Sequence, residues 1–277
     1  MDFLTASAAD FAAQITATKS QKERVKLCVK LRTELTEKLG TLAAVRRYLT
    51  PYRAAIKALP IKQVALLNSL RISTKANNKI NSDYKNSVEK HTEQGEFVDI
   101  STAAAAEIVA AAKALICDGT RLKVIAGLAL LTGRRTAEIV VTARLEKVQR
   151  NKLAAKFTGQ LKARGERPTY QIPLLADYDF INNALTSVQG LYKDFDISKV
   201  NSSLSTNLNK VVKVAFGEWL GEGVKMHDLR KFYAAYAYHS TGGRASKKSF
   251  RSFARQILGH GAGDSTTTET YNKYEII

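Results

Sequence analysis

The sequence predicts a mainly α-helical fold with one small antiparallel β-sheet, an α+β protein in two domains. Apolar residues recur at helical spacing along most of the 277 residues. Alternation of apolar and polar residues replaces that spacing only between residues 143 and 175, where it indicates strands. The helical pattern also breaks at residues 94–100, which separates a helical domain, residues 1–95, from a sheet-containing domain, residues 96–277.

The first domain is predicted to consist of helices. Apolar residues at helical spacing predict helices at residues 20–39 and 61–72. Between them, Thr50 and Pro51 predict a helix start, with the threonine as cap and the proline in the first turn. Residues 75–93 predict a polar helix rich in Asn and Lys, which either lies on the surface or faces a charged ligand.

The second domain follows the break at residues 94–100, which we interpret as a linker. Ser101 or Asp99 can cap the helix after it. A further apolar helix is predicted at residues 120–131, ending at the Thr-Gly pair 132–133.

Residues 143–175 are predicted to form the sheet, because apolar residues alternate at 153–157 and again at 170–174. Its last hairpin turn is expected at residues 163–166. Residues 177–274 return to helical spacing, with breaks at Gly190, Gly221, Gly242 and Gly259.

The charge of the chain favours a polyanionic partner. The formal net charge is +18, and both halves are basic: residues 1–100 carry 17 Lys and Arg against 10 Asp and Glu. Two basic halves are typical of a clamp that holds duplex DNA from both sides. Charge by itself does not distinguish DNA from RNA, from an anionic membrane, or from a solvated basic surface.

Several other classes of protein are disfavoured by the sequence. Cys28 and Cys117 lie far apart within apolar helical patterns, which predicts two core thiols of a cytoplasmic protein rather than a disulfide. No cluster of His and Cys has metal-ligand spacing, so we predict no metal and no other cofactor. The N-terminal residues lack the basic start of a secretory signal, and no apolar run reaches the roughly 20 residues of a membrane span.

Five short blocks in the second domain together supply the side chains for one chemistry, the metal-free cleavage of a phosphodiester by a tyrosine. In chain order they contribute arginine, lysine, histidine with arginine, histidine, and tyrosine. No single block is specific, but the ordered set is. The blocks are TGRRTAE (residues 132–138), GQLKAR (159–164), HDLR (227–230), LGH (258–260) and TTTETY (266–271).

Two arginines are the candidates for binding the phosphate. A guanidinium matches two phosphate oxygens at once, and scission develops negative charge on these oxygens. We choose Arg135, after the Thr-Gly turn, and Arg230. Arg134 is the rival in the first block and is otherwise predicted to contact DNA, as is Lys231 beside Arg230.

Lys162 is the candidate general acid, because it precedes the predicted hairpin turn and can reach a DNA groove. It would protonate the leaving 5′-oxygen. Arg164 and Arg167 follow it and are predicted to contact backbone phosphates.

Two histidines and one tyrosine complete the set. His227 stands three residues before Arg230, so both side chains project from one helical face, and His260 follows Gly259 at a helix end. An imidazole can accept the tyrosine proton or donate to a phosphate oxygen. Tyr271 is the predicted nucleophile, with Tyr274 as the rival.

The five blocks resemble the tyrosine recombinase superfamily, which includes integrases, telomere resolvases and, more distantly, type IB topoisomerases. The resemblance covers residues 100–277 and implies a tyrosine-recombinase-like catalytic domain behind a helical DNA-clamp domain. It implies catalytic residues Arg135, Lys162, His227, Arg230, His260 and Tyr271, with a 3′-phosphotyrosyl intermediate.

Two departures from integrases favour the telomere resolvase (protelomerase) branch, which closes DNA ends as hairpins. Tyr271 follows His260 by eleven residues, farther than in integrases, and the sequence given ends six residues later without the tail of many integrases. The segments FTGQLKAR, HDLRKFYAAYAY and YNKY also resemble this branch. The expected partner is an inverted-repeat DNA duplex bound by a dimer, in the cytoplasm and nucleoid of a bacterial or phage-type host. No membrane or small-molecule substrate is expected.

The alternatives differ in outcome rather than in chemistry. A site-specific recombinase would exchange strands between duplexes, a topoisomerase would reseal the original strand, and a degenerate protein would bind DNA without cutting it. The residues of the catalytic set do not choose among these outcomes.

Overall fold

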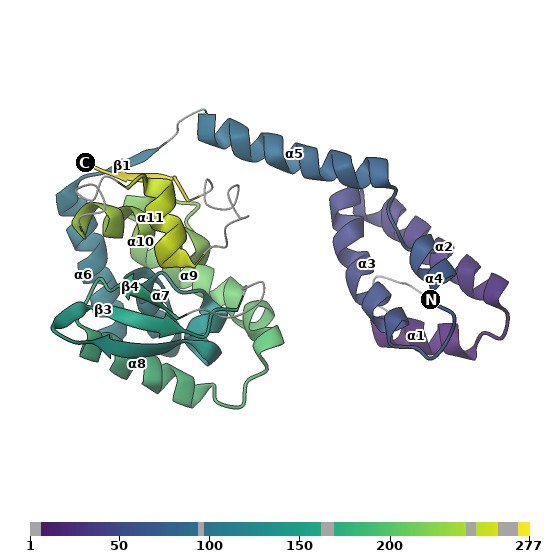
Figure 1. The fold of residues 1–277 in the computed structure, drawn as a ribbon, viewed down its shortest axis with the longest axis horizontal. Coiled ribbons are helices and arrows are strands. Elements are labelled where there is room, and N and C mark those ends of the chain that lie inside the picture. The colour runs from purple at the N-terminus through teal and green to yellow at the C-terminus, as the bar shows by residue number, and fades with distance from the viewer. Residues whose placement is uncertain (1–6, 94–96, 162–168, 242–247, 260–270) are drawn as a thin grey trace. The chain divides into compact units, whose positions relative to one another are not determined.

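The computed structural model describes residues 7–93, 97–161, 169–241, 248–259 and 271–277. The chain divides into two compact units, Met1–Ser87 and Val88–Ile277 (Figure 1). Each unit has its own hydrophobic core. The described part is mostly helical with a three-stranded antiparallel sheet, which confirms the predicted fold class.

The first unit is built from helices that pack around one core. Its buried side chains include Phe11, Leu31, Leu35, Leu49 and Ile56. The helices are α1 (Ala8–Ala17), α2 (Gln21–Leu39), α3 (Leu42–Lys57), α4 (Val64–Ser69) and α5 (Thr74–Glu93), the last of which continues into the second unit.

The helix start predicted at Thr50 and Pro51 is wrong, because α3 begins earlier and runs through the proline. Thr41 caps the helix by accepting a hydrogen bond from the amide of Ala44 at 3.3 Å. A proline inside a helix costs about 3 kcal/mol. Burial on both sides of Pro51 offsets that cost, since α3 places four side chains at helical spacing in the core: Val45, Leu49, Tyr52 and Ile56.

The helix predicted at residues 61–72 is shorter than expected, with only Val64–Ser69 in α4. The Gln63 side chain explains its start. Its amide donates to the carbonyl of Lys57 at 3.0 Å and also to that of Leu59, so the chain turns here at the end of α3.

The second unit surrounds a central helix. The elements in chain order are β1 (Val98–Ile100), α6 (Thr102–Asp118), α7 (Arg121–Thr132), the π-helical turn η1 (Glu138–Thr142), β2 (Arg144–Val148), β3 (Asn151–Thr158), β4 (Tyr170–Pro173), α8 (Tyr178–Leu191), η2 (Ile197–Lys199), α9 (Val200–Leu220), α10 (Met226–Ser240), α11 (Phe250–Leu258) and β5 (Tyr274–Ile276).

Helix α7 is the centre of this unit. Every residue from Val124 to Thr132 is buried, as expected for a helix that is apolar all round. Its neighbours are α6, α8, α9 and α10. The predicted helix at residues 120–131 is confirmed, including its end at Gly133. The segment after α7 is therefore held in the interior of the unit.

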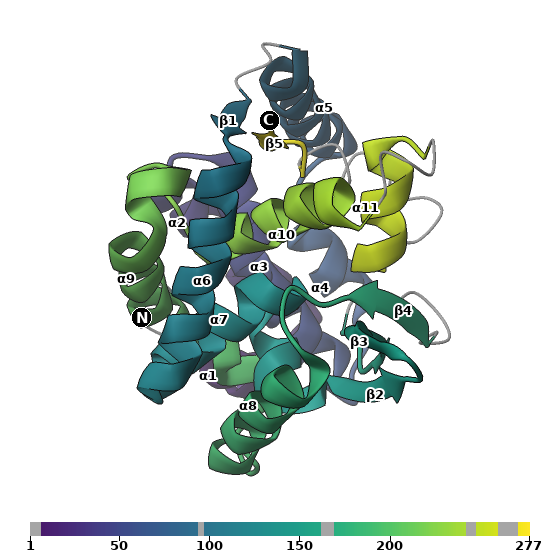
Figure 2. The same ribbon diagram turned by 90° about the vertical axis from the view of Figure 1, so that its left-hand side faces the viewer.

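The predicted antiparallel sheet is also present, in the order β2-β3-β4. Phe157 pairs with Leu145 on one side and with Tyr170 on the other. Figures 1 and 2 show α8 along one side of this sheet. Leu153 differs from the prediction because it is 56% exposed, whereas Ala155 and Phe157 are buried.

A second pairing was not predicted: β1 and β5 form a two-stranded parallel sheet. Val98 lies opposite Tyr274, and Ile100 lies opposite Ile276. The backbone amide and the hydroxyl of Thr102 both donate to the carbonyl of Ile277, at 2.8 and 3.0 Å. Residues 98–100 are thus a strand rather than part of a linker, and they fix the segment that follows Tyr271.

The prediction of two core thiols is half wrong. Cys28 is buried, whereas Cys117 is exposed, and neither forms a disulfide. The buried stripe of α6 includes Ile108, Ala112 and Ile116, and the next residue along the helix falls off that stripe. None of the helices in the described part of the chain combines the length and apolar character of a membrane span.

Candidate active site

The first block lies where α7 ends. Gly133 has a φ of 65°, a left-handed conformation that glycine adopts without strain. A side chain at this position would also overlap the ring of Tyr233 in α10. The Tyr233 hydroxyl in turn donates to the carbonyl of Pro173, at the end of β4, at 2.8 Å. Glycine is therefore required for α7, α10 and the sheet to approach each other.

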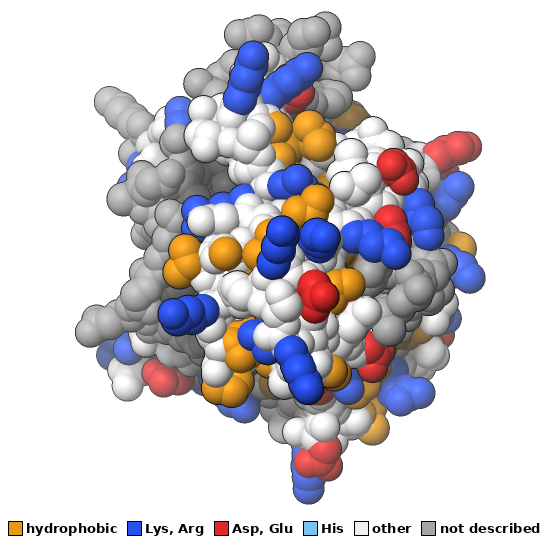
Figure 3. All heavy atoms as spheres, turned by 90° about the vertical axis from the view of Figure 1, so that its right-hand side faces the viewer, with side chains coloured by type: hydrophobic (Ala, Val, Ile, Leu, Met, Phe, Trp, Pro, Cys, Tyr) orange, Lys and Arg blue, Asp and Glu red, His pale blue; other side chains and the backbone are white. Residues whose placement is uncertain are grey.

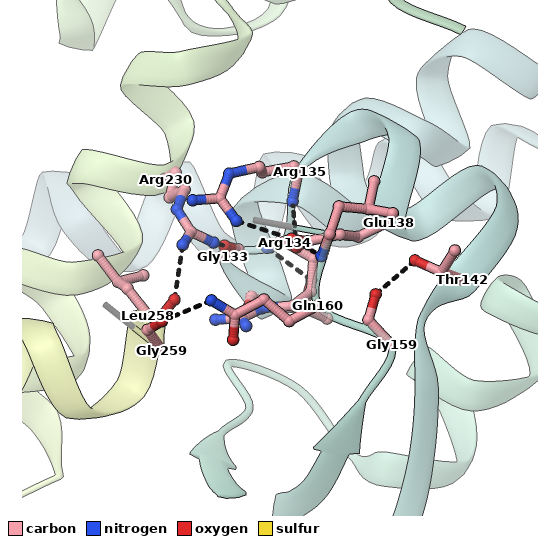
Figure 4. Close-up of polar contacts among 12 residues, drawn as sticks. Gly133, Arg134, Arg135, Glu138, Thr142, Gly159, Gln160, Arg230, Leu258 and Gly259 are labelled. Carbon is pink, nitrogen blue, oxygen red and sulfur yellow. Dashed lines mark hydrogen bonds and ion pairs between the residues drawn. The ribbon is translucent and has the colours of Figure 1, made fainter. Parts of the chain in front are cut away.

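Arg135 is held by a buried carboxylate. Its Nη1 donates to Oε1 of Glu138 at 2.7 Å, and its backbone amide donates to Oε2 at 3.1 Å (Figure 4). Glu138 is fully buried, while the Arg135 side chain keeps 23% of its surface exposed. Burial by itself would raise the pKa of the Glu138 carboxyl, but the charges of Arg134, Arg230 and Arg135 outweigh it and hold the pKa below its usual value. The carboxylate thus stays charged and fixes an accessible guanidinium.

Arg134 points elsewhere and is only 3% exposed. Its guanidinium lies 4.5 Å from the centre of the Phe157 ring. It donates to the hydroxyl of Tyr170 and to the carbonyl of Ile257, each at 2.7 Å. These contacts are all with groups of the protein, and the contact of Arg134 with DNA stays a prediction. Arg134 links the end of α7 to the sheet and to α11.

Arg230 connects its own block to three of the other four. From α10, its Nε donates to the Tyr271 hydroxyl at 3.1 Å. Its Nη2 donates to the carbonyl of Leu258 at 2.8 Å, and its Nη1 donates to the carbonyl of Gly133. Figure 4 shows the Arg135 side chain extending toward Arg230. The two arginines predicted to bind one phosphate therefore lie side by side.

The charge of Arg230 is costly in this environment. Burial, together with the positive charges of Arg134 and Arg135, lowers its pKa to about 10. The guanidinium remains charged at neutral pH. The positive charges of Arg135 and Arg230 repel each other strongly where water is excluded. An anion bound beside them would relieve that repulsion and would be stabilised by both.

Tyr271 lies against Arg230 and His227. Its side chain is 1% exposed, and its ring centre is 5.3 Å from that of His227, at an interplanar angle of 64°. His227 and Arg230 project from the same face of α10, as their spacing predicts. The structure thus brings together four of the six predicted catalytic residues: Arg135, His227, Arg230 and Tyr271.

His227 is held neutral. By accessible surface the residue is exposed. Desolvation of the imidazole by the surrounding protein, with the positive charges of Lys231 and Arg230 nearby, nevertheless lowers its pKa to about 4. At neutral pH the imidazole can therefore accept a proton.

We expect the His227 imidazole to titrate near pH 4, compared with 6.5 for an ordinary histidine. Because the folded-state pKa lies below the unfolded value, the unfolded chain takes up the proton first as the pH falls. The stability contribution is thus complete above pH 6.5 and is lost as the pH drops toward 4. An NMR titration of the imidazole and thermal unfolding of His227→Asn check this. Identical pH dependence of unfolding in wild type and variant would contradict the shift.

Tyr274, the rival nucleophile, lies in β5 and faces a different part of the core. It is 2% exposed, and its hydroxyl donates to the carbonyl of Leu220 at 3.4 Å. Its ring packs against Phe232 with centres 6.3 Å apart. Burial raises the pKa of the Tyr274 hydroxyl, and the charge of Asp228 adds to this effect.

Lys231, predicted to contact DNA, forms an ion pair within the protein. Its Nζ lies 3.1 Å from Oδ1 of Asp228, and Nζ of Lys273 lies 3.3 Å from the same oxygen. Asp228 also accepts the amide of Lys225 at 3.0 Å, which caps α10. Burial by itself would raise the pKa of this carboxyl, but the neighbouring ammonium groups hold it below its usual range.

Four predicted site residues lie outside the described residues: Lys162, Arg164, Arg167 and His260. Their blocks are nevertheless connected. Gln160, just after β3, is 2% exposed and donates through Nε2 to the carbonyl of Gly259, at the end of α11. A side chain at Gly259 would overlap Gln160 and the Tyr170 hydroxyl.

Three residues that hold parts of the site in place were not predicted as site residues: Glu138, Gln160 and Asp228. Each lies inside one of the five blocks, and this was the signal that could have found them. A buried carboxylate or amide is retained where it has charged or polar partners to hold. The Glu of the first block holds Arg135, the Gln of the second holds Gly259, and the Asp of the third caps α10.

Comparison with known proteins relates the fold to solved structures. The chain is similar to protelomerase TelA covalently complexed with substrate DNA, with a TM-score of 0.81 at 21% identity over 97% of this chain and 87% of that one. A point variant of TelA in the same kind of complex gives a TM-score of 0.80 at 20% identity, with the same coverage. Protelomerase TelK complexed with substrate DNA gives 0.62 at 17% identity, over 99% of this chain and 61% of that one.

These likenesses show a shared, tyrosine-recombinase-like fold. No curated protein sequence matches the chain. A family model of the telomere resolvase ResT/TelK catalytic domain matches residues 99–274, from β1 into β5 and thus across all five blocks. This match covers more than half of the chain and confirms the resemblance on which the sequence prediction was based. The chain therefore belongs to the telomere resolvase family, whose enzymes break and rejoin DNA to close its ends as hairpins.

Proposed function

We propose that Tyr271 is the nucleophile of this telomere resolvase and that Arg135 and Arg230 bind the scissile phosphate. The observation that carries the proposal is the 3.1 Å hydrogen bond from Arg230 Nε to the Tyr271 hydroxyl. A tyrosine oxygen that contacts the guanidinium binding the scissile phosphate lies close to the phosphorus that it attacks. Tyr274 is the weaker candidate, because its hydroxyl is directed to Leu220.

In the proposed reaction the Tyr271 oxygen forms a bond to phosphorus while the bond to the 5′-oxygen breaks. Lys162 gives the 5′-oxygen a proton, and the strand is left as a 3′-phosphotyrosine. Arg135 and Arg230 stabilise the charge that develops on the non-bridging oxygens. His227, which is neutral at pH 7, and His260 assist by accepting the tyrosine proton or donating to a phosphate oxygen.

Rejoining reverses these steps with a different 5′-hydroxyl. Cuts on opposite strands of one duplex leave two phosphotyrosines, and each is attacked by the 5′-hydroxyl of the complementary strand. Two hairpin ends result, and the two tyrosines are released. Two cuts related by symmetry require two protomers on an inverted repeat, so we propose that the protein acts as a dimer on DNA.

We further propose that residues 1–95 form the DNA clamp and residues 96–277 the catalytic domain. Residues 1–100 carry 17 Lys and Arg against 10 Asp and Glu, and this positive balance supports a DNA-binding N-terminal part. The TelA and TelK structures similar to this chain are themselves complexes with substrate DNA. Arg164, Arg167 and Lys231 are proposed as phosphate contacts. Such an enzyme would act in the cytoplasm and nucleoid of a bacterial or phage-type host.

The test is conversion of a symmetric inverted-repeat duplex in the presence of EDTA. We expect two hairpin products, each running as a single strand of double length on a denaturing gel. EDTA is included because we propose that arginine and lysine side chains, rather than a metal ion, stabilise the transition state. A strict magnesium requirement would contradict this mechanism.

The form of the product separates the alternatives. Strands exchanged between two duplexes, without hairpins, would favour a recombinase. Relaxation of supercoiled plasmid alone would favour a topoisomerase. Binding without any covalent intermediate would favour a degenerate DNA-binding protein.

A further inference from the structure

A groove in the first unit gathers three arginines that the catalytic site does not use. It has a volume of about 380 Å³ and lies between α3, the segment after α4 and the start of α5. Arg46 and Arg53 come from α3, and Arg71 follows α4. The buried side chains of Leu49 and Leu70 form part of its lining.

The groove has no internal counter-charge. The residues that line it include three guanidiniums and, among the described residues, no Asp or Glu. An adjoining groove that shares Arg46 adds Lys79 and a single carboxylate, Asp83. Positive charges brought together without a carboxylate repel one another, and a bound anion would relieve that repulsion.

One guanidinium in the groove has a donor atom without an acceptor among the described residues. The Nε atom of Arg53 is buried and has no hydrogen-bond partner within the described structure. Leaving a buried charged donor without an acceptor costs free energy. An acceptor bound in the groove would supply the missing partner.

The groove is also held in shape. Nη1 of Arg46 donates to Oδ1 of Asn81 at 3.0 Å, which joins α3 to α5. Nη1 of Arg32 in α2 donates to the carbonyl of Arg71 at 3.3 Å. Arg46, Leu49 and Arg53 are spaced three and four residues apart, so they share one face of α3.

One face of the molecule carries dispersed positive charge (Figure 3). Lys and Arg side chains are scattered over the face seen in Figure 3, among hydrophobic and acidic ones. Scattered positive side chains supply a general attraction to DNA but do not define a position on it. What distinguishes the groove is the combination of three arginines, an apolar lining and an unpaired buried donor.

We propose that this groove binds a phosphate of the DNA backbone. The proposal rests on the proposed function, since it assumes that DNA is the substrate. Bidentate pairing suits guanidinium and phosphate, and such contacts fix a protein on a duplex without reading its sequence. The groove thus sets affinity and position, whereas strand cleavage depends on the second unit.

The test compares DNA binding by the full chain and by the double variant Arg53→Gln/Arg71→Gln across a range of salt concentrations. Loss of one phosphate contact lowers the slope of log K against log salt by about 1. We expect that reduction together with weaker binding at each salt concentration. The matched control is Lys22→Gln/Lys26→Gln, which removes two exposed charges of α2 outside the groove lining, and we expect it to leave the slope unchanged.

Covalent trapping on suicide-nicked DNA separates this proposal from the proposed function. An unchanged salt slope in the groove variant, or an equal change in both variants, would overturn the phosphate site. Absence of adduct from wild type would overturn the tyrosine mechanism. The salt dependence of DNA binding would still test the phosphate site in the groove.

Discussion

Replacing Tyr271 with phenylalanine is expected to abolish the covalent protein–DNA adduct while DNA binding persists. The substitution removes one oxygen, which is the proposed nucleophile, and leaves the buried ring in place. It also leaves Nε of Arg230 without its acceptor at 3.1 Å, so a stability loss of about 1–3 kcal/mol is expected. Denaturing gels of the protein on suicide-nicked DNA measure the adduct, and thermal unfolding measures the stability.

Tyr274→Phe is the matched control, because it also removes one hydroxyl from a buried tyrosine near the C-terminal end of the described chain. Its hydroxyl bonds the carbonyl of Leu220, away from the arginines. We expect Tyr274→Phe to form the adduct at the wild-type rate. If instead Tyr271→Phe forms the adduct and Tyr274→Phe does not, the nucleophile is Tyr274.

Local patterns were enough to predict most of the fold. The apolar run of α7 reflects burial on all sides of the helix, and residues 155–157 of β3 alternate because one face of the strand meets the core. The β1–β5 pairing was missed because each strand has three residues, and the paired residues Ile100 and Ile276 are 176 positions apart in the sequence. Nothing local marks such a pairing.

Pro51 shows a local signal that tertiary packing overrides. A threonine followed by proline is a frequent helix start, and the sequence was interpreted that way. The buried side chains of Leu49 and Tyr52 lie on either side of the proline, and both need the helix to continue. Burial of several side chains outweighs one lost hydrogen bond.

The candidate site was predictable where residue types and spacing were sufficient. His227 and Arg230 lie three residues apart on a helix, so their common face followed from the sequence. Arg134 and Arg135 are adjacent, and no local rule distinguishes them. The rings of Phe157 and Tyr170 decide between them, because they bury Arg134 and leave Arg135 beside Arg230.

Replacing Arg230 with lysine is expected to lower the rate of DNA cleavage by at least about 100-fold, the typical cost of losing a preorganised transition-state donor. Lysine keeps the positive charge but has a single ammonium group. That group cannot reproduce the planar fork that reaches the Tyr271 hydroxyl and the carbonyls of Leu258 and Gly133 at once. Single-turnover cleavage of suicide-nicked DNA at saturating protein measures the effect on the chemical step.

Loss of folding could mimic this result, and Arg134→Lys controls for it. Arg134 is as buried as Arg230, and its guanidinium also bonds three groups, the carbonyls of Thr132 and Ile257 and the Tyr170 hydroxyl. Both variants should therefore lose stability to a similar extent. Only Arg230 contacts the proposed nucleophile, so the cleavage rate of folded Arg134→Lys should fall far less. Equal cleavage rates for the two variants would make Arg230 a structural arginine, and the phosphate-binding charge would then have to come from Arg135.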